Sequence, residues 1–177
     1  MQAVPLLKVV VAGNGAVGKT SLIRRFCEGK FQASRVATIG VDFYTHGVKL
    51  KSGPVKLSIW DMAGQARFAV VREGFYRGSR AAALVYDVTD PVSLTDLKRW
   101  REEVLRSAPL QGLAVVGNKV DLGRAVSAED GKAYADSIGA LYLETSALSG
   151  QGVAALFEAL AELASTSGRR EKRWWET

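Results

Sequence analysis

The stretch KVVVAGNGAVGKTSLI, residues 8–23, decides the fold of this 177-residue chain. It begins within a short apolar run, Leu6–Ala12, that has the length and the β-branched content of a buried strand. After a loop, Leu22, Ile23 and Phe26 recur at the spacing that puts them on one side of a helix. A strand, a glycine-rich loop and a helix in this order form the first unit of a parallel α/β sheet.

The glycine-rich loop between them is predicted to bind phosphate. The pattern GxxxxGK[ST] is complete in this loop, whose residues are Gly13, Asn14, Gly15, Ala16, Val17, Gly18, Lys19 and Thr20. Its glycines let the backbone curl until successive N–H groups point at phosphate oxygens. Lys19 adds a positive charge, and the Thr20 hydroxyl suits Mg²⁺, which prefers oxygen ligands. The alternative, a glycine-rich turn without a ligand, fits the complete pattern and its flanks less well.

The rest of the chain continues the alternation of strands and helices. Strand-like runs lie at 41–50, 55–60, 82–88, 113–118 and 140–145, and helical patterns lie at 91–107, 127–138 and 153–163. The first two runs flank KSGP, a turn-rich tetrapeptide, and are expected to pair antiparallel at one sheet edge. We predict an α/β fold of the P-loop NTPase type, a three-layer sandwich. Its sheet is mostly parallel and six-stranded, with one antiparallel edge strand and about five helices.

Composition and charge exclude several classes of protein. Hydrophobic residues make up 47 % and charged residues 24 %, which is ordinary for a globular domain. Cys27 is the only cysteine, so no intramolecular disulfide forms, and a reducing cytoplasmic compartment fits best. The net charge of +6 comes with no zinc-ligand spacing, RNA-binding aromatic signature or recognition helix, so we expect no nucleic-acid partner.

A second motif indicates which nucleotide is bound. Asn118, Lys119 and Asp121 follow a predicted strand, where open α/β sheets place ligand contacts. The Asp121 carboxylate has two acceptors for the N1–H and the N2 amino group of guanine. Adenine presents neither donor there, so the contact predicts selectivity for guanine.

With these motifs in place, the chain resembles the Ras superfamily of small GTPases, most closely its Rab-like members. The resemblance runs from Leu6 to about Leu163 and is carried by GNGAVGKT, TIGVDF from Thr38, IWDMAGQARF, YRGSRAAALVYDVTD, GNKVDL and ETSAL. It implies a small GTPase domain over residues 1–167, followed by a basic, tryptophan-containing tail at 168–177. It also implies that GTP or GDP binds with Mg²⁺ and that GTP is hydrolysed.

The resemblance assigns roles to further residues. Ser21 would touch the α-phosphate, and Phe31 would stack on the edge of the guanine. The backbone around Ser146, Ala147 and Leu148 would approach the base.

Around the γ-phosphate, the resemblance implies that Thr20, Thr38 and Asp61 hold the metal. The N–H of Gly64 would sense the γ-phosphate, and Gln65 would orient the attacking water, with Lys19 and Thr38 completing the catalytic set. Thr38 belongs to switch I, at 35–40, and Asp61, Gly64 and Gln65 belong to switch II, at 61–76. Both switches would bind effector proteins in the GTP state, and activating and exchange factors are the other expected partners.

Arg35 raises a further alternative for catalysis. It lies three residues before Thr38, the offset at which Gα subunits carry a built-in catalytic arginine. A solvated loop charge, with the arginine supplied by an external activator, is the favoured interpretation.

Three departures from the family pattern limit these expectations. Ala66 replaces a Glu that exchange factors often use, Met62 replaces a Thr, and Leu148 replaces a Lys near the base. The chain ends in WWET without a prenylation motif, so a truncated chain, a lineage without prenylation and a soluble protein all stay open. We expect a cytoplasmic protein whose tail is solvated, with weak contact to anionic membranes as the alternative. A nucleotide-binding scaffold without turnover is the alternative function, and a P-loop kinase lacks a visible lid.

Overall fold

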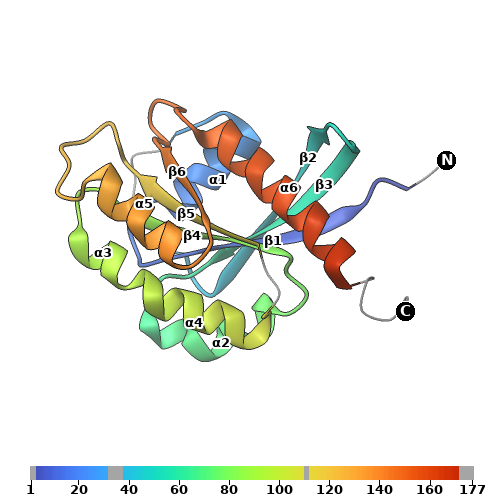
Figure 1. The fold of residues 1–177 in the computed structure, drawn as a ribbon, viewed down its shortest axis with the longest axis horizontal. Coiled ribbons are helices and arrows are strands. Elements are labelled where there is room, and N and C mark those ends of the chain that lie inside the picture. The colour runs from blue at the N-terminus through green and yellow to red at the C-terminus, as the bar shows by residue number, and fades with distance from the viewer. Residues whose placement is uncertain (1–2, 32–37, 110–111, 172–177) are drawn as a thin grey trace.

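The structure, a computed structural model, describes residues 3–31, 38–109 and 112–171, and for residues 168–171 it describes the backbone alone. Six strands form one sheet in the described part of the chain, in the order β2-β3-β1-β4-β5-β6 (Figure 1). Their bounds are β1 Leu6–Ala12, β2 Val41–Leu50, β3 Gly53–Met62, β4 Ala81–Asp87, β5 Gly112–Asn118 and β6 Leu141–Thr145.

The strand pairing confirms a mostly parallel sheet with one antiparallel edge strand. Strand β2 pairs antiparallel with β3, whereas β1, β3, β4, β5 and β6 run parallel to their neighbours in that part of the sheet. Leu50 lies opposite Gly53, so the hairpin closes through Lys51 and Ser52 alone. The connection is therefore two residues long instead of the four expected from KSGP.

Along the chain a helix follows β1, β3, β4, β5 and β6, and the sequence pattern predicts all of these except the one at 69–76. Their bounds are α1 Lys19–Glu28, α2 Ala69–Tyr76, α3 Pro91–Thr95, α4 Leu97–Ser107, α5 Ala128–Ser137 and α6 Val153–Glu171, with a 3₁₀ turn at Ala66–Phe68. The helix expected over 91–107 is interrupted at Asp96, so α3 and α4 follow one another as two segments. Helix α3 begins with Pro91 in its first turn, and the side chain of Asp90 caps it by accepting from the N–H of Val92.

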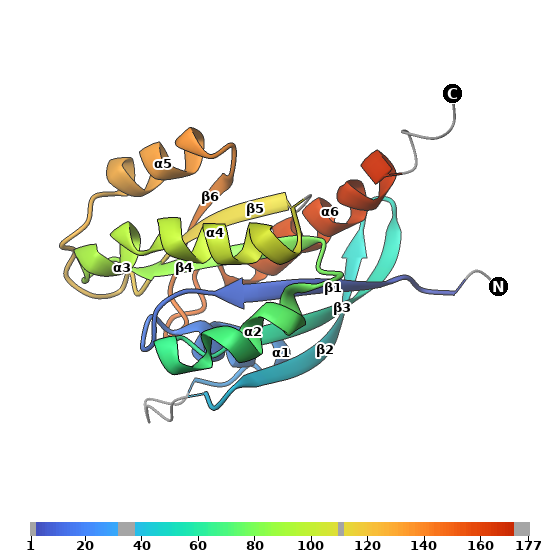
Figure 2. The same ribbon diagram turned by 90° about the horizontal axis from the view of Figure 1, so that it is seen from below.

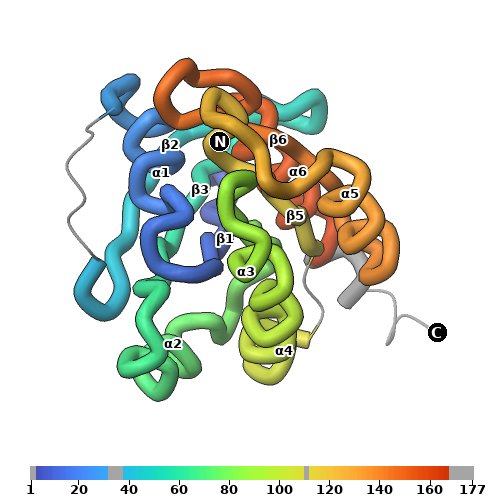
Figure 3. The backbone as a smooth tube through the Cα atoms, turned by 90° about the vertical axis from the view of Figure 1, so that its left-hand side faces the viewer, coloured from blue at the N-terminus to red at the C-terminus, as the bar shows by residue number. Residues whose placement is uncertain are grey.

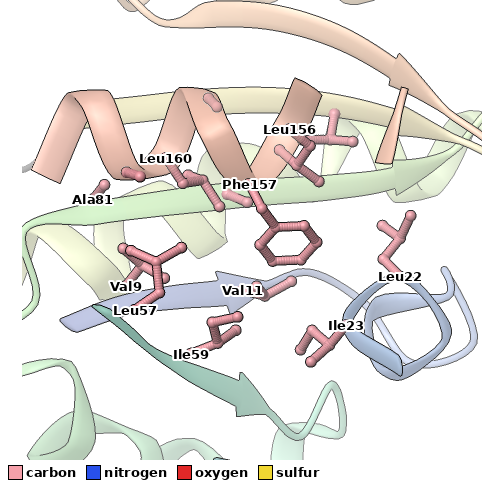
Figure 4. Packing of buried hydrophobic residues seen from close by; sticks show 14 of the residues in the cluster. Val9, Val11, Leu22, Ile23, Leu57, Ile59, Ala81, Leu156, Phe157 and Leu160 are labelled. Carbon is pink, nitrogen blue, oxygen red and sulfur yellow. The ribbon is translucent and has the colours of Figure 1, made fainter. Parts of the chain in front are cut away.

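Two helical layers cover the sheet and make the three-layer sandwich, with α1 and α6 above it in Figure 1 and α2 and α4 on the face that Figure 2 shows from below. Because successive strand residues point to opposite faces, Val9 and Val11 of β1 belong to one core cluster and Val10 and Ala12 to the other. The first cluster is closed by α1 and α6, and Figure 4 shows Phe157 of α6 directed toward β1. The second cluster is closed by α2, α4 and α5.

The topology gathers the functional loops at one edge of the sheet. The carboxyl ends of β1, β3, β4, β5 and β6 lie at the same edge because these strands run parallel. Figure 3 faces this edge. Open α/β sheets bind their ligands there, so the loops after these strands are the first place to look for a site.

Candidate functional site

The phosphate loop, residues 13–20, has a backbone that only glycine allows at two positions. Gly13 and Gly18 have φ angles of 148° and 99°. A Cβ on Gly13 would lie 2.2 Å from the carbonyl oxygen of Val85 in β4, and one on Gly18 would lie 2.4 Å from Nδ2 of Asn118. The loop is thus packed directly against the ends of the neighbouring strands.

Lys19, the first residue of α1, folds back across this loop. Its Nζ donates to the carbonyl oxygens of Gly13, at 2.8 Å, and Asn14, at 2.7 Å. The side chain is buried, and desolvation lowers the pKa of its ammonium from 10.5 to about 8, although the nearby Asp61 carboxylate partly opposes this. An anion that binds beside a buried ammonium favours its protonated form and so raises its pKa.

The loop after β5 forms a buried frame around the phosphate loop. Asn118 donates from Nδ2 to the carbonyl oxygen of Val17 at 2.9 Å, and its Oδ1 accepts from the Thr145 hydroxyl at 2.9 Å. Lys119, with a φ of 68°, donates from Nζ to the carbonyl oxygen of Ala16 at 2.7 Å. The segments predicted to bind base and phosphate are therefore joined by direct hydrogen bonds.

Lys119 also pairs with Asp87, a residue that the sequence analysis did not select. Its Nζ lies 2.8 Å from Oδ2 of Asp87, the last residue of β4. Hydrogen bonds from Lys119 and from Thr89 lower the pKa of this carboxyl below its usual value, although burial alone would raise it. A carboxylate at the carboxyl end of a strand next to β5 was the available signal, because adjacent parallel strands end side by side.

The residues assigned to the guanine base come together from two loops, here called the base loops, 118–121 and 145–148. The Ser146 hydroxyl donates to Oδ1 of Asp121 at 2.7 Å. Ala147 is buried beside it, whereas Leu148 is 51 % exposed. Phe31 lies just beyond α1 and is 38 % exposed, which leaves its ring accessible for stacking. Arg25 of α1 reaches toward the carbonyl oxygen of Leu148 at 3.4 Å.

Two hydroxyls and one carboxylate meet where the metal is expected. The Oγ1 atoms of Thr20 and Thr38 lie 2.9 Å apart, and the Thr38 hydroxyl lies 3.3 Å from Oδ2 of Asp61. Thr20 also donates to the same carboxylate oxygen. Asp61 is buried, which raises its pKa against the opposing effects of Thr20 and Lys19.

This cluster fits a hard cation. Oδ1 of Asp61 is buried and has no hydrogen-bond partner among the described residues. An orphaned carboxylate oxygen beside two hydroxyl oxygens is the kind of donor set that Mg²⁺ prefers. Thr20, Thr38 and Asp61, the three predicted metal ligands, are thus brought together by α1, the segment before β2, and β3.

The start of switch II lies against the phosphate loop. A Cβ on Gly64 would lie 2.2 Å from the backbone nitrogen of Gly15, so the two backbones are in direct contact. Gln65 follows in an extended conformation and is partly exposed. Ser21 lies in the first turn of α1, partly exposed. Arg35, the candidate catalytic arginine, falls outside the described residues.

A buried arginine in switch II is a second residue that the sequence analysis missed. Arg72 of α2 is fully buried and pairs with Glu103 of α4 at 2.8 Å. No local pattern signals this, because a charged residue in an amphipathic helix is ordinarily solvated and Glu103 lies 31 residues away.

A doubly wound sheet with a phosphate loop, a base loop after β5 and a hydroxyl–carboxylate cluster defines a GTP-binding protein of the P-loop class. The sequence matches the Ras family over residues 8–166. It is 43 % identical to Ras-related protein RABA5e of Arabidopsis thaliana over 156 residues, which cover 86 % of this chain and 72 % of that protein. It is 42 % identical to Ras-related protein Rab-21 of Mus musculus over 153 residues, covering 85 % and 69 %.

The chain belongs to the Ras family. It is a Rab-like GTP-binding switch with GTPase activity, and the predicted family, fold class and function are confirmed. None of the helices in the described part of the chain is long and apolar enough to span a membrane.

Proposed function

We propose that GTP and GDP bind at the carboxyl edge of the sheet, across the phosphate loop and the two base loops. The observation that carries this proposal is the pair of bonds from Asn118 and Lys119 to the backbone of the phosphate loop. The phosphates would contact the loop residues from Gly13 to Thr20 together with Ser21, and the N–H of Gly64 would contact the γ-phosphate. The base would contact Phe31, Asn118, Lys119, Asp121, Ser146, Ala147 and Leu148.

Guanine selectivity is assigned to Asp121. The hydroxyl of Ser146 donates to one carboxylate oxygen at 2.7 Å and so restrains the rotation of the carboxylate. A restrained carboxylate offers two acceptors to the two adjacent donors of guanine, whereas adenine leaves these acceptors unpaired.

Mg²⁺ is assigned to the cluster of Thr20, Thr38 and Asp61. Oxygen donors and an unpaired buried carboxylate oxygen support this assignment. The ion, when bound, neutralises charge on the phosphate oxygens. Thr38 is the only one of the three that lies in switch I, so its hydroxyl connects that segment to the nucleotide.

Hydrolysis is assigned to Gln65, supported by Lys19 and Thr38. Gln65 directly follows Gly64, whose backbone contacts the phosphate loop. Its side chain therefore begins close to the expected position of the γ-phosphate. An amide can donate to and accept from one water molecule and so orient its attack. Lys19 supplies a cation for the charge on the transferring group.

The arginine that accelerates hydrolysis is assigned to an activating partner, with Arg35 as the alternative within the chain. Single-turnover hydrolysis by Arg35→Ala distinguishes the two, because only a built-in arginine makes the unaided rate depend on this residue. Ala66 follows Gln65 at the position where the family pattern has a Glu that exchange factors often use. Exchange factors of this chain would therefore have to act through other contacts.

The switch is proposed to act in signalling or membrane traffic, through effectors that bind switch I and switch II. The chain is proposed to be cytoplasmic, and the alternative is weak contact of its tail with anionic membranes. The four basic side chains and two tryptophans of the tail, at 168–177, lie outside the described side chains.

The base assignment is tested by Asp121→Asn. We expect at least a hundredfold loss of affinity for GDP and GTP, because one acceptor becomes a donor that faces a donor of guanine. Titration calorimetry with GDP measures it, and Asp136→Asn, an exposed carboxylate paired with Lys132 on α5, is the matched control. Unchanged GDP affinity in Asp121→Asn would refute the assignment.

A further inference from the structure

Arg72 of α2 uses its whole guanidinium group in buried bonds. Its Nη1 donates to the carbonyl oxygens of Ala63, at 2.8 Å, and Gln65, at 2.7 Å. Its Nε and Nη2 donate to the two carboxylate oxygens of Glu103, at 3.0 Å and 2.8 Å. A buried arginine is costly unless it is paired, and these four bonds from its five N–H donors tie Arg72 to three other residues.

The two carbonyls that Arg72 binds flank Gly64. In a trans peptide the C=O and the following N–H point in opposite directions within one plane, and the described chain contains no cis peptide bond. The carbonyl of Ala63 and the N–H of Gly64 share such a plane. By holding that carbonyl, Arg72 points the Gly64 N–H away from its own guanidinium group.

Gly64 itself packs against the phosphate loop. The Cα of Gly64 faces Asn14 and Gly15, since a Cβ there would lie 2.5 Å from the carbonyl carbon of Asn14 and 2.2 Å from the nitrogen of Gly15. A cation on the carbonyl also polarises the peptide and makes its N–H a stronger donor. Arg72 therefore fixes and polarises the peptide that carries the Gly64 N–H beside the phosphate loop.

Helix α4 contacts Arg72 through Glu103 and Trp100. Glu103 also accepts from the Tyr76 hydroxyl at 2.5 Å, and the guanidinium carbon lies 4.4 Å from the centre of a Trp100 ring. Trp100 in turn donates from Nε1 to Oδ1 of Asn14, in the phosphate loop, at 2.8 Å. Figure 3 shows α2 and α4 side by side beneath the sheet. One helix therefore braces both Gly64 and the phosphate loop that faces it.

We propose that Arg72 is a positioning residue that sets the discrimination between GTP and GDP. It acts through the peptide of Ala63 and Gly64, whose N–H recognises the γ-phosphate only when that peptide is held. This inference rests on the role proposed above for Gly64, and it adds the buried pair of Arg72 and Glu103 as the support of that role.

The test compares Arg72→Met with Arg106→Met. Arg106 of α4 forms the exposed ion pair with Glu73 of α2, at 3.2 Å, so its loss weakens the same helix contact without touching the peptide of Gly64. Affinities for GDP and for a non-hydrolysable GTP analogue are measured for both variants, together with single-turnover hydrolysis. A ratio of two affinities is insensitive to a general loss of stability, which lowers both.

In Arg72→Met we expect the preference for the GTP analogue over GDP to fall at least fivefold and hydrolysis to slow at least tenfold. The affinity for GDP should change less than twofold, and Arg106→Met should match the native chain. Equal losses for both nucleotides, or an unchanged ratio, would overturn the inference. If Arg72→Met does not fold, Glu103→Gln decides: a fall of the ratio by twofold or more supports the inference, and an unchanged ratio refutes it.

Gly64→Ala separates this inference from the proposal on which it rests. If this variant keeps the native ratio of affinities, then the role of Gly64 itself is wrong. If it loses the ratio while Arg72→Met keeps it, then Gly64 recognises the γ-phosphate without help from Arg72.

Discussion

The two ends of the nucleotide site are built differently. At the base end, Asn118 is buried and bonded on both sides of its amide, and Lys119 bridges the phosphate loop and Asp87. At the γ-phosphate end, Thr38 makes only two contacts through its hydroxyl among the described residues, one with the Thr20 hydroxyl and one with the Asp61 carboxylate. Its neighbour Ile39 is 80 % exposed. The base end is therefore preformed by the sheet, whereas the γ-phosphate end gains most from what the ligand contributes. A switch needs this division, because one end must hold both nucleotides and the other must tell them apart.

The largest effect is expected at the preformed end. Asn118→Ala removes a buried bond to Val17 and leaves the Thr145 hydroxyl without its acceptor. Each lost buried hydrogen bond costs about 1–3 kcal/mol, so affinity for GDP and for GTP should both fall by roughly a hundredfold. Calorimetry with each nucleotide measures this, and a loss confined to GTP would contradict the comparison.

A smaller and one-sided effect is expected at the other end. Thr38→Ala removes the hydroxyl that joins switch I to Thr20 and Asp61. Affinity for a GTP analogue should fall about tenfold, or ~1.4 kcal/mol, while affinity for GDP stays within about twofold, because the γ-phosphate alone engages this segment. Competition between labelled GDP and the analogue gives both numbers in one experiment. An equal loss for GDP would mean that Thr38 belongs to the preformed part.

The smallest expected effect is the coupling of stability and nucleotide binding to the protonation of Lys19. Its pKa of about 8 lies below the unfolded value of 10.5, so the free protein holds fewer protons on this group than the unfolded chain between these values. The stability of the free protein should therefore rise with pH across that window. Bound phosphate favours the ammonium form, so GDP binding at pH 8 should take up on the order of half a proton. Calorimetry in buffers of different ionisation enthalpy detects it, and heats independent of the buffer would argue against a depressed pKa.

Most of the sheet and of the site could be predicted from sequence because both depend on local patterns. Buried strands read as apolar runs, and the phosphate loop needs particular glycines, which the φ angles of Gly13 and Gly18 confirm. The break at Asp96 could not be predicted, since the pattern of apolar residues continues across it. Arg72 was missed for a different reason. Its burial depends on Glu103 and Trp100, and the sequence does not show that α4 will lie against α2.

The convergence of distant loops at one edge of the sheet has a consequence for unfolding. The proposed contacts run from Gly13 in the phosphate loop to Leu148 after β6. A bound nucleotide therefore joins segments that lie far apart along the chain. Such a ligand binds the native state alone and acts as a reversible cross-link. At a hundred times its dissociation constant it adds about 2.7 kcal/mol to the free energy of unfolding, and at a thousand times about 4.1 kcal/mol. The concentration of free nucleotide thereby affects the fraction of molecules that are unfolded at any time. The chain is most vulnerable to proteolysis in the interval between release of one nucleotide and binding of the next.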